Sequence, residues 1–130
     1  MNVKEMFDLK GKKAIITGGG RGIGSFIAKG LAEAGADIML ASRKIENLQK
    51  EADELKALGV KAVPVKCDME KKEDIDGLVK TAMDEFGTVD ILVNNAGLTW
   101  GAPTLQFPLD KWDKIFNVNV RGLWILTQQV

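Results

Sequence analysis

The sequence alternates short apolar runs with segments whose apolar residues recur at helical spacing, and glycines repeatedly follow the helical segments. The predicted strands cover residues 14–17, 37–41, 62–67 and 89–93. The predicted helices between them cover residues 23–34, 45–55 and 75–86, and they end near Gly35, Gly59 and Gly87. Strands that alternate with helices of this length form βαβ units with right-handed crossovers. We therefore predict an α/β fold built on a doubly wound parallel sheet, with the strand order 3-2-1-4.

Two segments add detail to this pattern. Pro64 lies inside the third predicted strand, and because proline cannot donate a ladder hydrogen bond, this strand is expected at an edge of the sheet. From Leu109 to Val130 the spacing predicts one long helix that is apolar nearly all round and needs partners on two sides. No glycine, proline or polar cap closes this helix at Val130. We expect residues 1–130 to be the amino-terminal portion of a longer domain.

The residue types that the sequence lacks exclude several chemistries. The chain has no His, which excludes a Ser-His-Asp or Cys-His mechanism. It also has no Tyr and therefore no phenolic acid or base. Its one cysteine, Cys67, excludes an internal disulfide and a multi-cysteine zinc site, and no metal site is predicted. Lys plus Arg and Asp plus Glu each number 18, and this zero net charge argues against nucleic acid or membrane partners. Without a secretory signal or a membrane-length apolar run, a cytoplasmic location is expected.

A glycine-rich turn, Thr17-Gly18-Gly19-Gly20-Arg21-Gly22-Ile23-Gly24, lies between the first predicted strand and the first predicted helix. Glycines let the backbone turn sharply and approach a diphosphate, whose charge is met by free N–H groups at the helix start. The spacing Gly-x-x-x-Gly-x-Gly differs from the usual dinucleotide fingerprint, and such a loop can also be a plain connection. No Lys-Ser or Lys-Thr follows the glycines, which disfavours a phosphate-loop NTPase. The position of the turn favours nucleotide binding.

Four motifs, in this order, resemble those of the short-chain dehydrogenase/reductase family. They are the glycine turn, Asp68 after the third predicted strand, Asn94-Asn95-Ala96-Gly97 after the fourth, and Asn117-Val118-Asn119-Val120-Arg121-Gly122 in the last helix. The resemblance covers nearly the whole chain and implies a Rossmann-like nucleotide-binding domain over residues 1–130. It also implies an oxidoreductase that interconverts an alcohol and a carbonyl in a small substrate. The first twelve residues are similar to those of gluconate-type dehydrogenases and of tropinone-reductase-like members.

The resemblance implies roles for individual residues. It places seven of them against the diphosphate and the adenosine ribose: Gly18, Gly22, Ile23, Gly24, Asn95, Ala96 and Gly97. Ile23 would contribute its backbone N–H, whereas Asn94 can be mainly structural. Asp68 resembles the carboxylate that accepts a hydrogen bond from the adenine amino group, with Met69 beside it. Its position also suits a cap for the third helix, and the two roles are compatible.

The end of the second predicted strand bears on the choice between NAD and NADP. An NAD site usually has an acidic residue there, which binds the ribose 2′-hydroxyl and repels a 2′-phosphate. This chain instead has Ser42 and Arg43, and Arg21 adds a cation from the glycine turn. Since arginine bonds phosphate in a bidentate manner, these residues favour NADP(H) over NAD(H). The alternative is that Arg43 belongs to the solvated start of the second helix.

In the resembled family, hydride transfer needs a Ser, a Tyr and a Lys that follow the fourth helix, and none can be assigned because Tyr is absent. Only the supporting residue Asn119 matches, with the implied role of holding a water molecule in a proton relay. Its alternative is an amide that satisfies helix backbone. We expect this chain to be inactive by itself. The alternative function is a non-catalytic nucleotide-binding or oligomerising module, and a homo-oligomer is expected in either case.

Overall fold

The structure, a computed structural model, describes all residues from 1 to 130. Four parallel strands form a single sheet: β1 (Lys13–Thr17), β2 (Asp37–Ser42), β3 (Ala62–Lys66) and β4 (Ile91–Val93). They lie in the order β3-β2-β1-β4, which confirms the predicted topology. The fourth strand is three residues long, shorter than the five predicted, because only 91–93 pair with β1.

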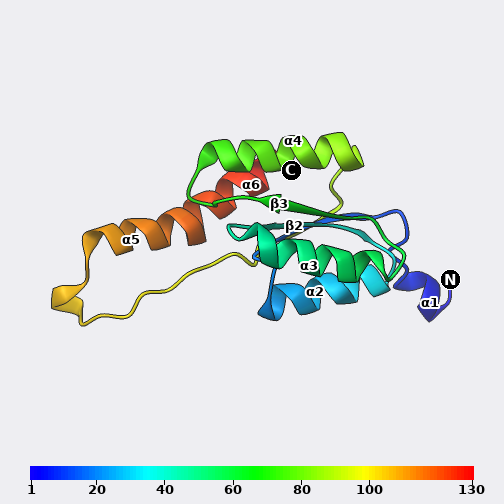
Figure 1. The fold of residues 1–130 in the computed structure, drawn as a ribbon, viewed down its shortest axis with the longest axis horizontal. Coiled ribbons are helices and arrows are strands. Elements are labelled where there is room, and N and C mark those ends of the chain that lie inside the picture. The colour runs from blue at the N-terminus through cyan, green and yellow to red at the C-terminus, as the bar shows by residue number, and fades with distance from the viewer.

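Helices cover both faces of the sheet (Figure 1). Helices α2 (Gly22–Glu33) and α3 (Ile45–Lys56) lie on one face, and α4 (Lys72–Phe86) and α6 (Leu123–Gln129) lie on the other. A short helix, α1 (Val3–Met6), precedes the sheet at the amino terminus. None of the helices combines the length and apolar character that a membrane span requires. The three-layer arrangement is the doubly wound architecture that the alternating pattern predicts.

Adjacent strand residues face opposite layers, and this alternation builds two cores. Ile16 and Leu40 pack with α2 and α3, whereas Ile15 and Met39 pack with α4 and α6, and all four side chains are fully buried. A strand buried on both faces needs apolar residues at every position, because successive side chains point to opposite sides. This explains why β1 and β2 are continuous apolar runs rather than alternating ones.

Pro64 lies in β3, at the edge of the sheet, as its missing N–H requires. The predicted helix ends also hold. Gly35 and Gly87 have φ values of +105° and +74°, in the left-handed region that suits the residue after a helix.

The segment after β4 forms an arm that extends away from the body of the molecule (Figure 1). It contains a 3₁₀ turn at Thr104–Gln106 and α5 (Leu109–Phe116), and a π-helical segment, η2 (Asn117–Gly122), connects α5 to α6. The prediction of one uninterrupted helix from 109 to 130 is therefore wrong in its middle. Gly122 passes so close to the β3–α4 connection that a Cβ atom there would lie 2.2 Å from the carbonyl oxygen of Met69. π-helical turns of this kind are rare and frequently occur at functional sites.

Candidate functional site

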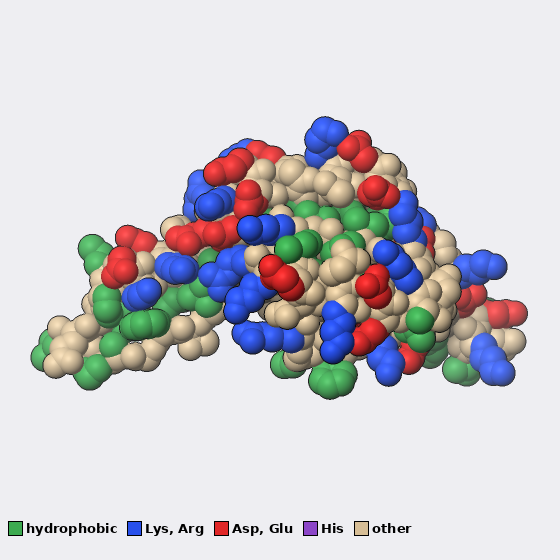
Figure 2. Space-filling view, in the orientation of Figure 1, with side chains coloured by type: hydrophobic (Ala, Val, Ile, Leu, Met, Phe, Trp, Pro, Cys, Tyr) green, Lys and Arg blue, Asp and Glu red, His purple; other side chains and the backbone are tan.

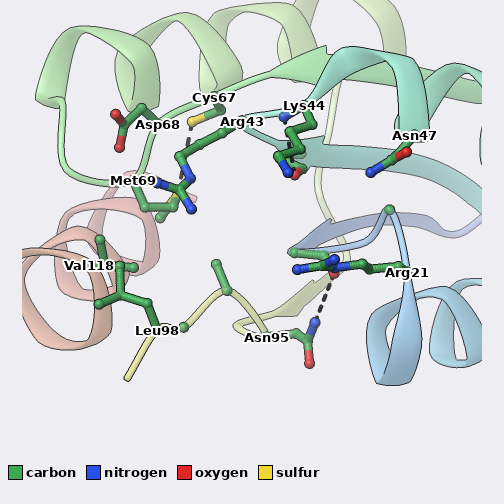
Figure 3. A pocket seen from close by; sticks show the side chains of 16 residues that line it. Arg21, Arg43, Lys44, Asn47, Cys67, Asp68, Met69, Asn95, Leu98 and Val118 are labelled. Atoms are coloured by element: carbon green, nitrogen blue, oxygen red, sulfur yellow. Dashed lines mark hydrogen bonds between the residues drawn. The ribbon is translucent and has the colours of Figure 1, made fainter. Parts of the chain in front are cut away.

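A cavity of about 290 Å³ opens at the edge of the sheet where the strands end (Figure 3). Ligands of open α/β sheets bind outside the carboxyl ends of the strands, at the point where strand order reverses, which here lies between β1 and β4. Sixteen residues line the cavity: Gly18, Gly20, Arg21, Ala41, Ser42, Arg43, Lys44, Asn47, Cys67, Asp68, Met69, Asn95, Ala96, Gly97, Leu98 and Val118. They come from the end of β2, from the turns that follow the four strands, from the first turn of α3 and from η2.

The glycine turn forms one wall of this cavity, and at several of its positions the backbone geometry requires glycine. Gly18 and Gly22 have φ values of +65° and +60°, which favour glycine. A Cβ atom at Gly24 would lie 2.3 Å from the carbonyl oxygen of Gly18. The first turn of α2, which starts at Gly22, has no side chain capping its N–H groups. Free N–H groups beside an open cavity are the donor set that a diphosphate needs.

Thr17 and Asn95 join the glycine turn to the turn after β4. The Thr17 hydroxyl, which is buried, accepts hydrogen bonds from the backbone N–H groups of Asn95 and Ala96 at 3.1 and 3.0 Å. The Asn95 side chain donates to the carbonyl oxygen of Gly18 at 3.0 Å. Sequence reasoning did not assign a site role to Thr17, because its partners lie 78 and 79 residues away along the chain.

The neighbouring Asn94 faces away from this junction. Its amide donates to the hydroxyl of Thr127 in α6 at 3.1 Å, and it does not line the cavity. This contact agrees with the structural role considered for Asn94.

Three cations are among the residues that line the cavity. In Figure 3, the side chains of Arg21, Arg43 and Lys44 extend toward the cavity from the glycine turn and from the end of β2. None of them forms an ion pair with a residue of the chain. Lys and Arg side chains gather at this end of the sheet, where the arm joins the body (Figure 2). With Asp68 as the one acidic lining residue, the cavity carries a positive excess that suits an anionic ligand.

At the end of β3, Asp68 accepts a hydrogen bond from the backbone N–H of Glu70 at 2.9 Å, and its own N–H donates to Asp74. Helix α4 starts at Lys72 with Lys71 as its cap, so the suggestion that Asp68 caps this helix is wrong. Burial, together with the nearby charges of Asp74 and Asp68, raises the pKa of the Cys67 thiol to about 12. Cys67 is therefore a neutral, buried side chain in the cavity wall, next to Met69.

The Asn119 amide pairs with the backbone of Leu98. Its oxygen accepts from the Leu98 N–H at 3.0 Å, and its nitrogen donates to the Leu98 carbonyl oxygen at 2.9 Å. The amide thus bonds backbone groups, as the alternative to a water-holding role predicted. These groups belong to the loop after β4, whereas the alternative expected helix backbone. These two bonds use one of the two amide hydrogens and one of the two oxygen lone pairs of Asn119. This contact ties η2 to the loop that forms the cavity floor.

The structure brings together nine of the twelve residues predicted to contact a nucleotide: Gly18, Arg21, Ser42, Arg43, Asp68, Met69, Asn95, Ala96 and Gly97. The other three, Gly22, Ile23 and Gly24, lie in the first turn of α2 beside the cavity, where a role through backbone N–H groups does not require a lining side chain. Sequence reasoning did not single out Asn47. This residue lines the cavity from the first turn of α3 and does not lie in a turn that directly follows a strand.

Comparison with known proteins identifies the family of the chain. A family model described as short chain dehydrogenase matches residues 12–130. The chain belongs to this family. The membership agrees with the Rossmann-like topology and with the four motifs that suggested it.

Two known proteins illustrate how far the similarity extends. The 2-dehydro-3-deoxy-D-gluconate 5-dehydrogenase of Pseudoalteromonas atlantica is 42% identical over 128 residues, which are 97% of this chain and 50% of that protein. The expected likeness to gluconate-type members is thus confirmed. A crystal structure of a short-chain type dehydrogenase/reductase from Mycobacterium marinum superposes with a TM-score of 0.93 at 38% identity, covering 98% of this chain and 50% of that one. The chain spans about half the length of the short-chain dehydrogenases it matches.

Solved members of the family that resemble this chain contain either nicotinamide cofactor. A short chain dehydrogenase from Burkholderia cenocepacia, with a TM-score of 0.90 and 37% identity over 94% of this chain and 50% of its own, is in complex with NADP. A xylitol dehydrogenase with a TM-score of 0.89 and 33% identity over 94% of this chain and 47% of its own is bound to NAD⁺. The fold therefore accommodates both cofactors, and the side chains around the cavity have to decide between them.

Proposed function

We propose that this short-chain dehydrogenase chain forms the nucleotide-binding half of an NADP(H)-dependent oxidoreductase that interconverts an alcohol and a carbonyl in a small substrate. The observation that carries the proposal is the set of three unpaired cations, Arg21, Arg43 and Lys44, around a cavity that glycine backbone borders. A carboxylate that would bind a ribose 2′-hydroxyl is missing from the end of β2.

The residues of the cavity divide the cofactor between them in this proposal. Backbone N–H groups of the first turn of α2, including that of Ile23, bind the diphosphate. Arg21, Ser42 and Arg43 bind the 2′-phosphate, and the guanidinium groups do so through paired donors. Asp68 accepts from the adenine amino group beside Met69, and the turn of Asn95, Ala96 and Gly97 lies along the adenosine ribose. A bound nicotinamide supplies the hydride.

Proton transfer at the substrate needs groups that these 130 residues do not provide, because the sequence contains no Tyr. We propose that residues 1–130 are the amino-terminal part of a longer domain whose remaining part supplies the Ser, Tyr and Lys of the family. In this proposal Asn119 positions the Leu98 loop, and its second amide hydrogen remains available for the water molecule of the implied proton relay. The chain by itself is expected to bind the cofactor without turnover. The cytoplasmic location stays a prediction from the sequence.

Calorimetric titration of the purified protein with NADPH and NADH tests the cofactor assignment. We expect NADPH to bind more tightly, and Arg43→Ala to weaken NADPH binding by roughly tenfold to a hundredfold while NADH binding changes little, since hydrogen bonds to charged groups contribute about 1.5–3 kcal/mol. Arg121→Ala is the matched control, because Arg121 is also exposed and unpaired but does not line the cavity. NADH binding as tight as NADPH binding contradicts the assignment.

A second candidate function, a nucleotide-binding module that oligomerises and does not catalyse, is favoured by the exposed apolar side chains of the arm and the last helix. Leu109, Trp112, Phe116, Val120 and Trp124 recur every three or four residues, and each is at least 46% exposed. We propose that a homo-oligomer covers part of this stripe, since apolar patches of this kind mark interaction surfaces. NADPH-dependent carbonyl reduction by a longer form of the protein that supplies the Ser, Tyr and Lys argues for the enzyme, whereas cofactor binding without reduction in that form argues for the module.

A further inference from the structure

The first turn of α3 is held firmly against the glycine turn and α2. Leu48 is fully buried, and a Cβ atom at Gly20 would lie 3.2 Å from its Cδ2 atom. One turn further along, the Ser25 hydroxyl donates to the Glu51 carboxylate at 2.6 Å and joins α2 to α3. These two contacts fix where the start of α3 lies relative to the cavity.

Asn47 precedes Leu48 and lies four residues before Glu51, so it shares a helix face with the Glu51 carboxylate. Its Cβ atom would lie 3.5 Å from a Cβ atom built at Gly20, which places it directly beside the glycine turn. Glu51 has Ser25 as its partner, whereas Asn47 is an exposed residue at the rim of the cavity whose amide has no hydrogen-bond partner in the chain. In Figure 3 its amide points to the same side of the cavity as Lys44, across from Arg21.

We propose that Asn47 is a further specificity-determining residue, which donates an amide N–H to a phosphate on the ribose 2′-oxygen. This inference rests on the proposed NADP(H) preference and deepens it. The three cations supply charge but sit on long, flexible side chains. The Asn47 side chain is neutral and short, and the packing of α3 fixes the backbone that carries it, so the amide supplies direction. An aspartate at the same position would repel the phosphate and accept a bond from a 2′-hydroxyl, which reverses the selection.

Adenosine 2′,5′-bisphosphate and 5′-AMP, which differ only in the 2′-phosphate, are the probes that test the proposal, by calorimetry on the purified protein. We expect Asn47→Ala to weaken binding of the bisphosphate by roughly tenfold and Asn47→Asp by roughly a hundredfold, with 5′-AMP affinity unchanged within threefold. Gln49→Glu is the matched control, because it adds the same charge to α3 at an exposed position that does not line the cavity. It is expected to leave both affinities unchanged.

The possible outcomes distinguish the Asn47 assignment from the NADP(H) assignment on which it rests. If the unsubstituted protein prefers the bisphosphate and neither Asn47 variant alters that preference, the Asn47 assignment is overturned and the NADP(H) assignment stands. Equal weakening of both probes overturns it too, since that result indicates a damaged cavity rim. If the unsubstituted protein binds both probes equally, there is no 2′-phosphate selection for Asn47 to provide, and both assignments are overturned. Unfolding midpoints equal to that of the unsubstituted protein confirm that the variants are folded.

Discussion

Two glycines of α2, Gly24 and Gly30, occupy the same helix but different surroundings, and replacing each with alanine separates packing from helix propensity. A Cβ atom at Gly24 would lie 2.3 Å from the Gly18 carbonyl oxygen and 2.6 Å from the Asn95 side-chain nitrogen. Carbon and oxygen atoms in proteins rarely approach closer than about 3.3 Å, so the turn or the helix has to move by about 1 Å. A Cβ atom at Gly30 meets nothing within 4 Å.

The expected free energies of unfolding follow from these distances. Overpacking against backbone costs about 3 kcal/mol, and the gain in helix propensity from glycine to alanine returns about 1 kcal/mol. Gly24→Ala is therefore expected to destabilise the protein by about 2 kcal/mol, whereas Gly30→Ala stabilises it by about 0.5–1 kcal/mol. Because the glycine turn must shift, Gly24→Ala is also expected to lose NADPH binding, and Gly30→Ala is expected to keep it.

Urea denaturation followed by circular dichroism measures both changes, and the two variants serve as controls for each other. The reasoning is refuted if Gly24→Ala unfolds at the same urea concentration as Gly30→Ala. It is also refuted if the Gly24 variant keeps NADPH affinity, because the turn would then tolerate the extra methyl group without moving.

Three further predictions follow from single side chains. Burial by itself raises the pKa of Asp37, but hydrogen bonds and charges from Lys13 and Lys61 lower it more, so its folded-state pKa lies below the ordinary value. Asp37→Asn should therefore lower the free energy of unfolding at pH 7 by up to about 1 kcal/mol. The stability difference between the variant and the unsubstituted protein should vanish as the pH falls through the lowered pKa of Asp37. A stability difference that stays the same at acidic pH contradicts the prediction. Because the pKa of the Cys67 thiol is about 12, iodoacetamide at pH 8 should label it only after denaturation, as mass spectrometry can determine. Asn119→Asp removes the donor to the Leu98 carbonyl oxygen and should destabilise the protein by about 2 kcal/mol in urea titrations. A variant that is as stable as the unsubstituted protein contradicts this prediction.

Hydrophobic spacing predicted most of the fold because it reports burial locally. The apolar runs of β1 and β2 and the helix-ending glycines needed no knowledge of distant residues, and Pro64 indicated an edge strand by its chemistry alone. The same reasoning failed where burial is ambiguous. Apolar residues all round the segment from 109 to 130 gave no sign that η2 would interrupt the helix, since such a segment has no single apolar stripe whose phase a π turn would visibly shift.

The site divides in a similar way. The glycine turn, Arg21, Arg43 and the turn after β4 were predictable because each follows a strand, and the ends of parallel strands meet at one edge. The partners of individual polar groups were not predictable. Thr17 bonds residues 78 and 79 positions away, and the Asn119 amide bonds a loop 21 positions away.

The sequence by itself therefore determined the order of strands, the covered faces and the edge at which a nucleotide would bind, because these depend on periodicity and on the conformational freedom of glycine. The tertiary structure alone decided which polar groups are used and which remain free. It pairs the Asn119 amide with the backbone of Leu98 and excludes Asp68 as a helix cap. It also brings the amide of Asn47, which has no partner in the chain, to the cavity. The physical reason is that a hydrogen bond depends on atoms within about 3 Å, and only the folded chain brings such distant atoms together.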